Sequence, residues 1–150
     1  MTYLSEHCTP ELSVCLGPCE QGDANACYAA ALRVQATGGP EDQSEALFFR
    51  ACSLGIASGC TNRAAGIMNL EGHRPGALEC ATRTFDAMCS RSDPWACTMF
   101  AFNLATGAGT RRDLTRALEV LPGACRFDLD DPACKSALEL KKKIDAARSR

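Results

Sequence analysis

The chain has few of the residues that common functional signatures need. It contains two His and one Trp in 150 residues, every Lys lies at position 135 or later, and no stretch approaches 18 consecutive apolar residues. The sequence therefore predicts no membrane span, and its first 16 residues lack the basic and apolar regions of a classical export signal. The formal net charge is −2, so no excess of positive charge argues for nucleic acid or an anionic membrane as the partner.

Residues typical of strands are also scarce. Val, Ile and Thr are sparse, Ala is abundant, and no apolar–polar alternation of useful length occurs. The chain is nevertheless 46% hydrophobic and 23% charged, a composition that can bury a core. These features predict an all-α fold in a single domain covering residues 1–150.

Cysteine, in contrast, is abundant, with 11 residues in the chain. Three pairs are eight positions apart and a fourth pair is nine apart: Cys19 and Cys27, Cys52 and Cys60, Cys89 and Cys97, Cys125 and Cys134. Corresponding members recur after about 36 residues, which indicates a repeated supersecondary unit. We place the repeats at about 20–52, 53–89 and 90–125, after a leading partial unit at 1–19.

Each repeat reads as two helices. Apolar residues follow every second Cys at helical spacing, and a shorter helix precedes the next first Cys, at 42–54, 76–90 and 113–121. Asp23, Asp93 and Asp130 each lie four residues before a Cys and are expected to cap the helices that contain Cys27, Cys97 and Cys134. A closing helix is expected at about 130–148. Helix hairpins of this kind stack as an α-solenoid.

Two segments carry a resemblance to a known family. Residues 107–117 (Gly-Ala-Gly-Thr-Arg-Arg-Asp-Leu-Thr-Arg-Ala) resemble the Sel1-like repeat, a relative of the tetratricopeptide repeat, and the 51–60 junction is similar to its cysteine-rich branch, the secreted Helicobacter cysteine-rich proteins. The resemblance covers roughly residues 19–140 and implies disulfides that join the end of one repeat to the start of the next. The turn at 72–76 departs from the pattern because it lacks the usual Asp.

Three chemistries compete for the paired cysteines. Two Cys at facing ends of a tight helix connection lie within reach of a disulfide. Each Cys could instead be a small buried hydrophobic residue. A zinc site would require pairs of Cys separated by two to four residues. We favour the four disulfides, with Cys8 and Cys15 as a candidate fifth bridge. Cys80 is then unpaired, and we expect it to be a buried thiol rather than an intermolecular linker or a reactive site.

Stable disulfides point to an oxidising compartment, secreted, periplasmic or similar. The absence of a signal in the chain as given leaves three alternatives: a trimmed form of an exported protein, an unconventional route, or thiols that remain reduced.

Catalysis is the alternative function. The resemblance implies β-lactamase-like or penicillin-binding activity, but Ser-x-x-Lys and Gly-x-Ser-x-Gly are both absent, and Ser92-Asp93-Pro94 reads better as a helix start than as a Ser-Asp-Asn element. The two histidines, His7 and His73, cannot supply a three-His zinc site. We therefore expect no catalytic residues, no cofactor and no metal.

A binding scaffold needs only a shaped surface. Positions two, six and nine residues after each second Cys lie away from the cysteine stripe, and the polar ones suit recognition of peptide amides or carboxylates. Four of them form the predicted concave binding face: Arg33, Asn62, Asn69 and Asn103. An ordinary solvated helix face is the alternative. We expect a monomer that binds a protein or peptide, and we assign the basic residues of 135–150 to helix-dipole stabilisation and solubility, in preference to an acidic partner or self-association.

Overall fold

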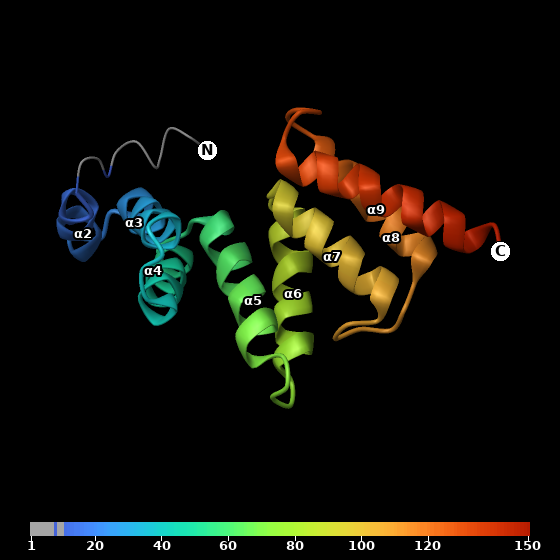
Figure 1. The fold of residues 1–150 in the computed structure, drawn as a ribbon, viewed down its shortest axis with the longest axis horizontal. Coiled ribbons are helices and arrows are strands. Elements are labelled where there is room, and N and C mark those ends of the chain that lie inside the picture. Colours follow the sequence, from blue (N-terminus) through green and yellow to red (C-terminus); the bar gives the residue numbers. More distant parts are fainter. Residues whose placement is uncertain (1–7, 9–10) are drawn as a thin grey trace. The chain divides into compact units, whose positions relative to one another are not determined.

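The computed structural model describes residue 8 and residues 11–150, and the fold of this part of the chain is all-α, as the sequence predicts. Figure 1 shows helices joined by short connections, without a strand among the described residues. The helices are α2 (Ser13–Glu20), α3 (Ala24–Ala36), α4 (Glu41–Ser53), α5 (Ala57–Glu71), α6 (Ala77–Ser90), α7 (Pro94–Thr106), α8 (Leu114–Val120), the 3-10 helix η1 (Leu121–Cys125) and α9 (Pro132–Arg148).

Two compact units make up the chain, Met1–Arg63 and Ala64–Arg150, and each is described by itself. Helices that follow one another in sequence pack together within each unit: α2 on α3 and α3 on α4 in the first, α6 on α7 and α7 on α8 in the second. The 3-10 helix and α9 complete the second unit by packing on α7. The single domain and the repeat boundaries expected from the sequence remain predictions, as does a solenoid.

The core of the first unit lies between α3 and α4. Tyr28 and Phe48 are buried there, with their ring centroids 5.9 Å apart. The same cluster contains three alanines of α3, Ala29, Ala30 and Ala31, which are buried almost completely and have side chains small enough for close approach of two helices. This explains why an Ala-rich sequence forms a packed hairpin.

The core of the second unit is built around α7. Phe85 of α6, Phe100 and Leu104 of α7 and Ile144 of α9 are buried in one cluster. A polar contact crosses the same core, since the hydroxyl of Thr98 donates to the carbonyl of Ala133 at 2.9 Å. The side chains of α7 therefore contact neighbouring helices on more than one side.

Three of the four junctions between paired helix-end cysteines share one backbone motif. The third residue after the first Cys of the pair has a positive φ: Gly22 (φ 93°), Gly55 (φ 104°) and Ser92 (φ 70°). At each of the three, the next residue's N–H bonds to a carbonyl five residues back, which is the hydrogen bond of a Schellman C-cap. The chain therefore reverses sharply, and the next helix begins within a few residues.

The cap of α9 corrects one prediction. Asp23 caps α3 as expected, by accepting from the N–H of Ala26 at 3.1 Å. At α9 the capping residue is Asp131, whose carboxylate accepts from the N–H of Ala133 at 2.9 Å, and Asp130 lies one residue earlier. The helix begins at Pro132, a residue suited to the first helical position, so the cap falls on the residue directly before it.

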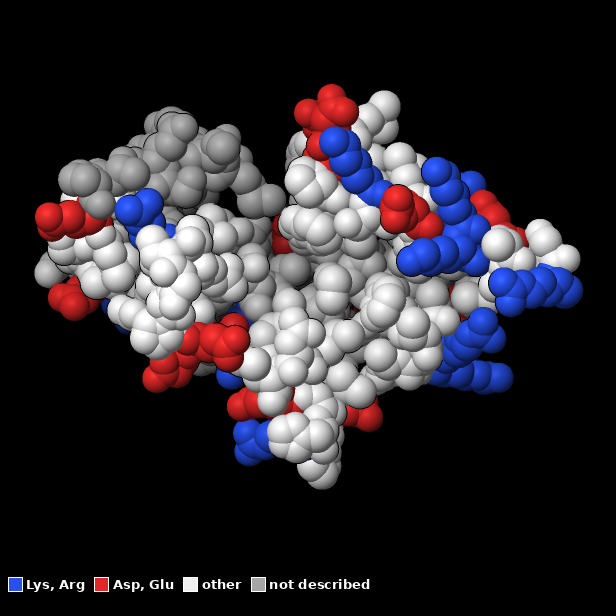
Figure 2. Space-filling model, in the orientation of Figure 1, with Lys and Arg blue, Asp and Glu red and all other residues white. Residues whose placement is uncertain are grey.

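Basic residues are concentrated on the last helix. Figure 2 shows Lys and Arg side chains gathered over α9 and toward the end of the chain, with acidic side chains between them. Within α9, Lys141 and Asp145 form an i,i+4 ion pair, with Nζ 3.0 Å from Oδ2. Arg148 lies in the last turn of α9, where a cation stabilises the helix dipole. Among the described helices, none has the length and apolar character needed to cross a membrane.

Candidate functional site

Five disulfides define the framework of the molecule. Four of them join the end of one helix to the start of the next, with Cα atoms 4.5–4.6 Å apart, and the fifth links Cys8 to Cys15 with Cα atoms 5.3 Å apart. The inter-helix bridges are Cys19–Cys27 (α2–α3), Cys52–Cys60 (α4–α5), Cys89–Cys97 (α6–α7) and Cys125–Cys134 (η1–α9). Such pairing is consistent with an oxidising environment.

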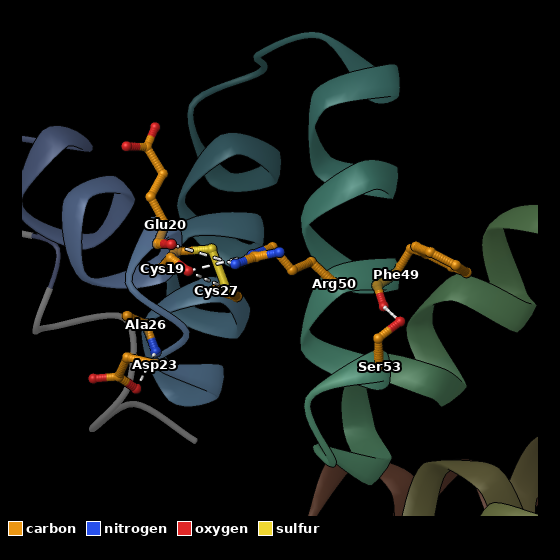
Figure 3. Close-up of a disulfide and its surroundings, with 8 residues drawn as sticks. All are labelled: Cys19, Glu20, Asp23, Ala26, Cys27, Phe49, Arg50 and Ser53. Carbon is orange, nitrogen blue, oxygen red and sulfur yellow. Dashed lines mark hydrogen bonds between the residues drawn. A yellow bond between two sulfur atoms is a disulfide. The ribbon is translucent and has the colours of Figure 1, made fainter.

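The Cys19–Cys27 bridge has a polar contact with a third helix. Figure 3 shows Arg50 of α4 pointing toward the C-terminal end of α2, where its Nε donates to the carbonyl of Cys19 at 3.3 Å and its Nη2 to that of Glu20 at 3.4 Å. The last carbonyls of a helix have no partner within the helix, so a nearby guanidinium satisfies them. Arg50 thereby fixes α4 against the bridged α2–α3 connection.

The Cys89–Cys97 bridge packs against the 3-10 helix. A Cβ added at Gly123 would lie 2.7 Å from the Sγ of Cys97, so only glycine leaves room for this sulfur. The bridge therefore holds η1 against α7 as well as joining α6 to α7.

The unpaired Cys80 is exposed, so the prediction of a buried thiol is wrong. The buried face of α6 consists of Ala81, Thr82 and Phe85. Cys80 is one residue before this face, and one residue turns a helix by about 100°. Its side chain therefore points to solvent.

The predicted concave face is divided between the two units. Arg33 (α3) and Asn62 (α5) belong to the first unit and are half-buried, and the amide of Asn62 donates to Tyr28 Oη at 3.3 Å and to the carbonyl of Ser58 at 2.8 Å. Asn69 belongs to the second unit and is exposed. The structure thus gives Asn62 a packing role, and it does not bring these residues together as one described surface.

The prediction that Asn103 belongs to the binding face is wrong, because its side chain is completely buried. Its Nδ2 donates to Thr82 Oγ1 at 2.9 Å, whereas its Oδ1 has no hydrogen-bond partner among the described residues. The Thr82 hydroxyl in turn lies 2.8 Å from the carbonyl oxygen of Leu78 and 2.9 Å from that of Ala108. It has one proton, so it donates to one of these carbonyls at a time. Asn103 is therefore a core residue that ties α7 to α6 and to the loop after α7.

That loop forms one wall of a cavity of about 550 Å³ in the second unit. The other walls come from α6, the second half of α7 and the start of α8. Phe100 and Leu104, both buried, lie at its apolar part, and Thr82 and Thr110 contribute polar surface. Its four cations are all Arg: Arg83, Arg111, Arg112 and Arg116.

The lining carries a net charge of +2, because two carboxylates, Asp86 and Asp113, face the four guanidinium groups. Asp113 accepts from the N–H of Arg116 at 2.9 Å as the cap of α8. The guanidinium of Arg116 lies 5.7 Å from the centroid of the Phe100 ring, and Arg112 Nε donates to the carbonyl of Ala105 at 3.1 Å. No carboxylate of the described residues lies within ion-pair distance of any of the four Arg.

A close backbone approach positions the loop. Gly109 has φ +66°, and a Cβ at this position would lie 2.2 Å from the carbonyl oxygen of Leu78 in the first turn of α6. Glycine is therefore required where the loop meets α6. Sequence reasoning missed the cavity, and the only signal was Arg111-Arg112 within the repeat-like segment 107–117.

The described residues show no cluster suited to hold a metal ion. His7 lies outside the described part, and His73 is exposed in the turn after α5. No model of a known protein family matches the chain, and no curated protein is significantly similar to it. What the structure establishes is an all-helical, cysteine-rich protein with five disulfides.

Proposed function

We propose that this chain is a disulfide-linked helical repeat scaffold of the Sel1-like kind, which binds a protein or peptide partner in an oxidising compartment such as the extracellular space or the periplasm. The observation that supports the proposal is the regular placement of bridges at the connections α2–α3, α4–α5, α6–α7 and η1–α9, with an unbridged connection between each of the first three. Each bridge fixes two helix ends and thereby the side chains that those helices present.

Rigid helices suit binding for an energetic reason. Association costs free energy for each side chain or loop that must be ordered, so a surface that is ordered beforehand loses less affinity. A closed loop of nine residues removes roughly 2.5 kcal/mol of unfolded-chain entropy per bridge in the chain-entropy model. A catalytic site, in contrast, needs a nucleophile and a base that converge with a group that stabilises developing charge.

The test is capture of a partner by the oxidised protein, followed by its identification and a direct affinity measurement. We expect the combined exchange of Arg33, Asn62 and Asn69 to Ala to weaken that affinity at least about tenfold. The matched control exchanges Lys142 and Lys143, which are exposed on α9, to Ala and should bind as the wild type does. Thermal melting of both variants must show that they are folded.

Two results would contradict the proposal. One is equal affinity of the partner for the reduced, unfolded chain, because a preformed surface would then be unnecessary. The other is saturable turnover of a chromogenic β-lactam by the purified protein, which would favour the hydrolase alternative.

A further inference from the structure

We propose that the Arg-lined cavity of the second unit binds an acidic segment of a polypeptide, with carboxylates on the guanidinium groups and a neighbouring apolar side chain toward Phe100 and Leu104. This inference rests on the proposed function, since it names the kind of polypeptide that the scaffold takes. The cavity is formed by residues of the second unit alone.

The size of the cavity favours a peptide over a single ion. Its volume of about 550 Å³ falls within the roughly 300–1,000 Å³ of ligand pockets. One water molecule accounts for about 30 Å³ of liquid, so a small inorganic anion would fill a minor part of the space. The four Arg that line it are exposed, which leaves the cavity open to a chain that enters from solvent.

The charges of the lining favour carboxylates. Arg presents a planar fork of donors that matches a carboxylate with two parallel hydrogen bonds. The guanidinium groups of Arg83 and Arg111 make no hydrogen bond or ion pair within the described part of the chain, and Arg112 uses its Nε but not its terminal nitrogens in the Ala105 contact. With a net charge of +2, the lining is neutralised by a segment that brings two carboxylates.

The apolar part of the cavity adds a second requirement. Phe100 and Leu104 line it together with the charged groups, and the Arg116 guanidinium lies over the Phe100 ring. Phe100 is 6% and Leu104 3% exposed, so the apolar surface that a ligand can cover here is small. An apolar side chain beside the carboxylates would cover it, and the guanidinium groups supply the larger part of the recognition.

The walls of the cavity are fixed before any ligand binds. The Cys89–Cys97 bridge joins α6 to α7, and the Thr82 hydroxyl links α6 to the carbonyl of Ala108 in the loop. Gly109 brings the same loop against the backbone of α6. A site held in this way needs little ordering on binding.

The experiment measures fluorescence anisotropy of a labelled peptide, Glu-Glu-Leu-Glu-Glu, titrated with the full oxidised chain at physiological salt. We expect saturable binding, and at least about tenfold weaker binding to the double variant Arg83→Gln and Arg116→Gln, because each exchange removes charge-assisted hydrogen bonds. The control variant, Arg148→Gln and Arg150→Gln, changes the net charge by the same amount outside the cavity and should bind within about twofold of the wild type. Circular dichroism establishes that both variants are folded.

Further arms separate the sources of the anion. The peptide Gln-Gln-Leu-Gln-Gln should not bind, and inorganic phosphate should displace the acidic peptide only at concentrations that screen charge in general. Displacement by micromolar phosphate would overturn the inference in favour of a free-anion site. If the Arg83/Arg116 variant and the Arg148/Arg150 variant weakened binding of the acidic peptide equally, the inference would be overturned in favour of nonspecific electrostatic attraction.

The outcomes also distinguish this inference from the proposed function. If a captured partner depends on Arg33, Asn62 and Asn69 while the acidic peptide does not bind, the cavity assignment alone is wrong. If the peptide binds in the cavity while no partner depends on those three residues, the face assigned in the proposed function is wrong.

Discussion

Replacing Gly109 with Ala tests whether the loop after α7 is held against α6 by a backbone contact. An added Cβ would lie 2.2 Å from the carbonyl oxygen and 2.3 Å from the carbonyl carbon of Leu78, and 2.7 Å from the nitrogen of Glu79. These are backbone atoms of a helix, so they cannot move aside as a flexible side chain would. The left-handed backbone (φ +66°) adds a second penalty for any residue with a Cβ.

The two penalties have separate magnitudes. A non-glycine residue in the left-handed region costs roughly 1–2 kcal/mol, and inserting a methyl group into a filled site costs roughly 1–3 kcal/mol. We therefore expect Gly109→Ala to reduce the free energy of unfolding by about 2–5 kcal/mol. Gly76→Ala is the matched control, because Gly76 has φ +81° in the same unit but no atom within 4 Å of an added Cβ. It should lose about 1–2 kcal/mol.

Urea denaturation monitored by Trp95 fluorescence is the appropriate assay. Trp95 is the one Trp of the chain and lies at the start of α7, so its emission reports on the second unit. The free energy follows from the midpoint and slope of the transition. If Gly109→Ala and Gly76→Ala lost the same stability to within about 0.5 kcal/mol, the close approach of the loop to α6 would be refuted.

Three further predictions concern stability. Removal of the Cys52–Cys60 bridge by two Ala exchanges should lower the midpoint of urea denaturation, followed by circular dichroism of the whole chain, by an amount equivalent to about 2.5 kcal/mol, whereas Cys80→Ala should change it by less than about 0.5 kcal/mol; an equal effect of both would contradict a structural bridge. Ser92→Gly should be more stable than Ser92→Ala by about 1 kcal/mol in the same assay, because both exchanges remove the hydrogen bond from Arg126 to the Ser92 hydroxyl and only glycine relieves φ 70°; equal stability of the two variants would contradict the strained junction. Asn103→Asp places a carboxyl in a site with 0% exposure, where burial raises its pKa above the unfolded value of about 3.9. Its stability deficit relative to wild type should therefore be small below pH 4 and grow as the pH rises toward the folded-state pKa; a deficit that does not depend on pH would contradict this burial.

The helices could be predicted from the sequence because their signals are local. The expected ranges 42–54, 76–90 and 113–121 lie close to α4, α6 and α8. Each junction between a first and a second Cys spans fewer than a dozen residues, so spacing, caps and turn glycines determine its geometry. The caps differ in two places: α9 is capped by Asp131, directly before Pro132, and Asp93 is at the capping position of α7 but its side chain makes no cap hydrogen bond.

Burial on the helix surfaces could not be predicted in the same way. Residues 99–104 of α7 are apolar apart from Asn103, and its position six residues after Cys97 assigned it to the predicted binding face. In the structure α7 packs against α6, α8, η1 and α9, and the Asn103 side chain bonds to Thr82 of α6. Contacts with four elements depend on tertiary structure, which the spacing from a cysteine does not encode.

The cavity could not be predicted from the sequence for a related reason. Arg83 belongs to α6, Arg116 to α8 and Arg111 to the loop before it, and each alone resembles an ordinary solvated surface residue. Only the packing of α6, α7 and α8 brings the three together. The close approach at Gly109 likewise depends on a backbone contact with a helix distant in sequence.

The disulfide framework is tested most directly by peptide mapping of the purified protein without reduction, after alkylation of free thiols. We expect alkylation at Cys80 alone and five linked peptide pairs: Cys8–Cys15, Cys19–Cys27, Cys52–Cys60, Cys89–Cys97 and Cys125–Cys134. Alkylation of the paired cysteines in folded protein, or bridges between different partners, would contradict this framework.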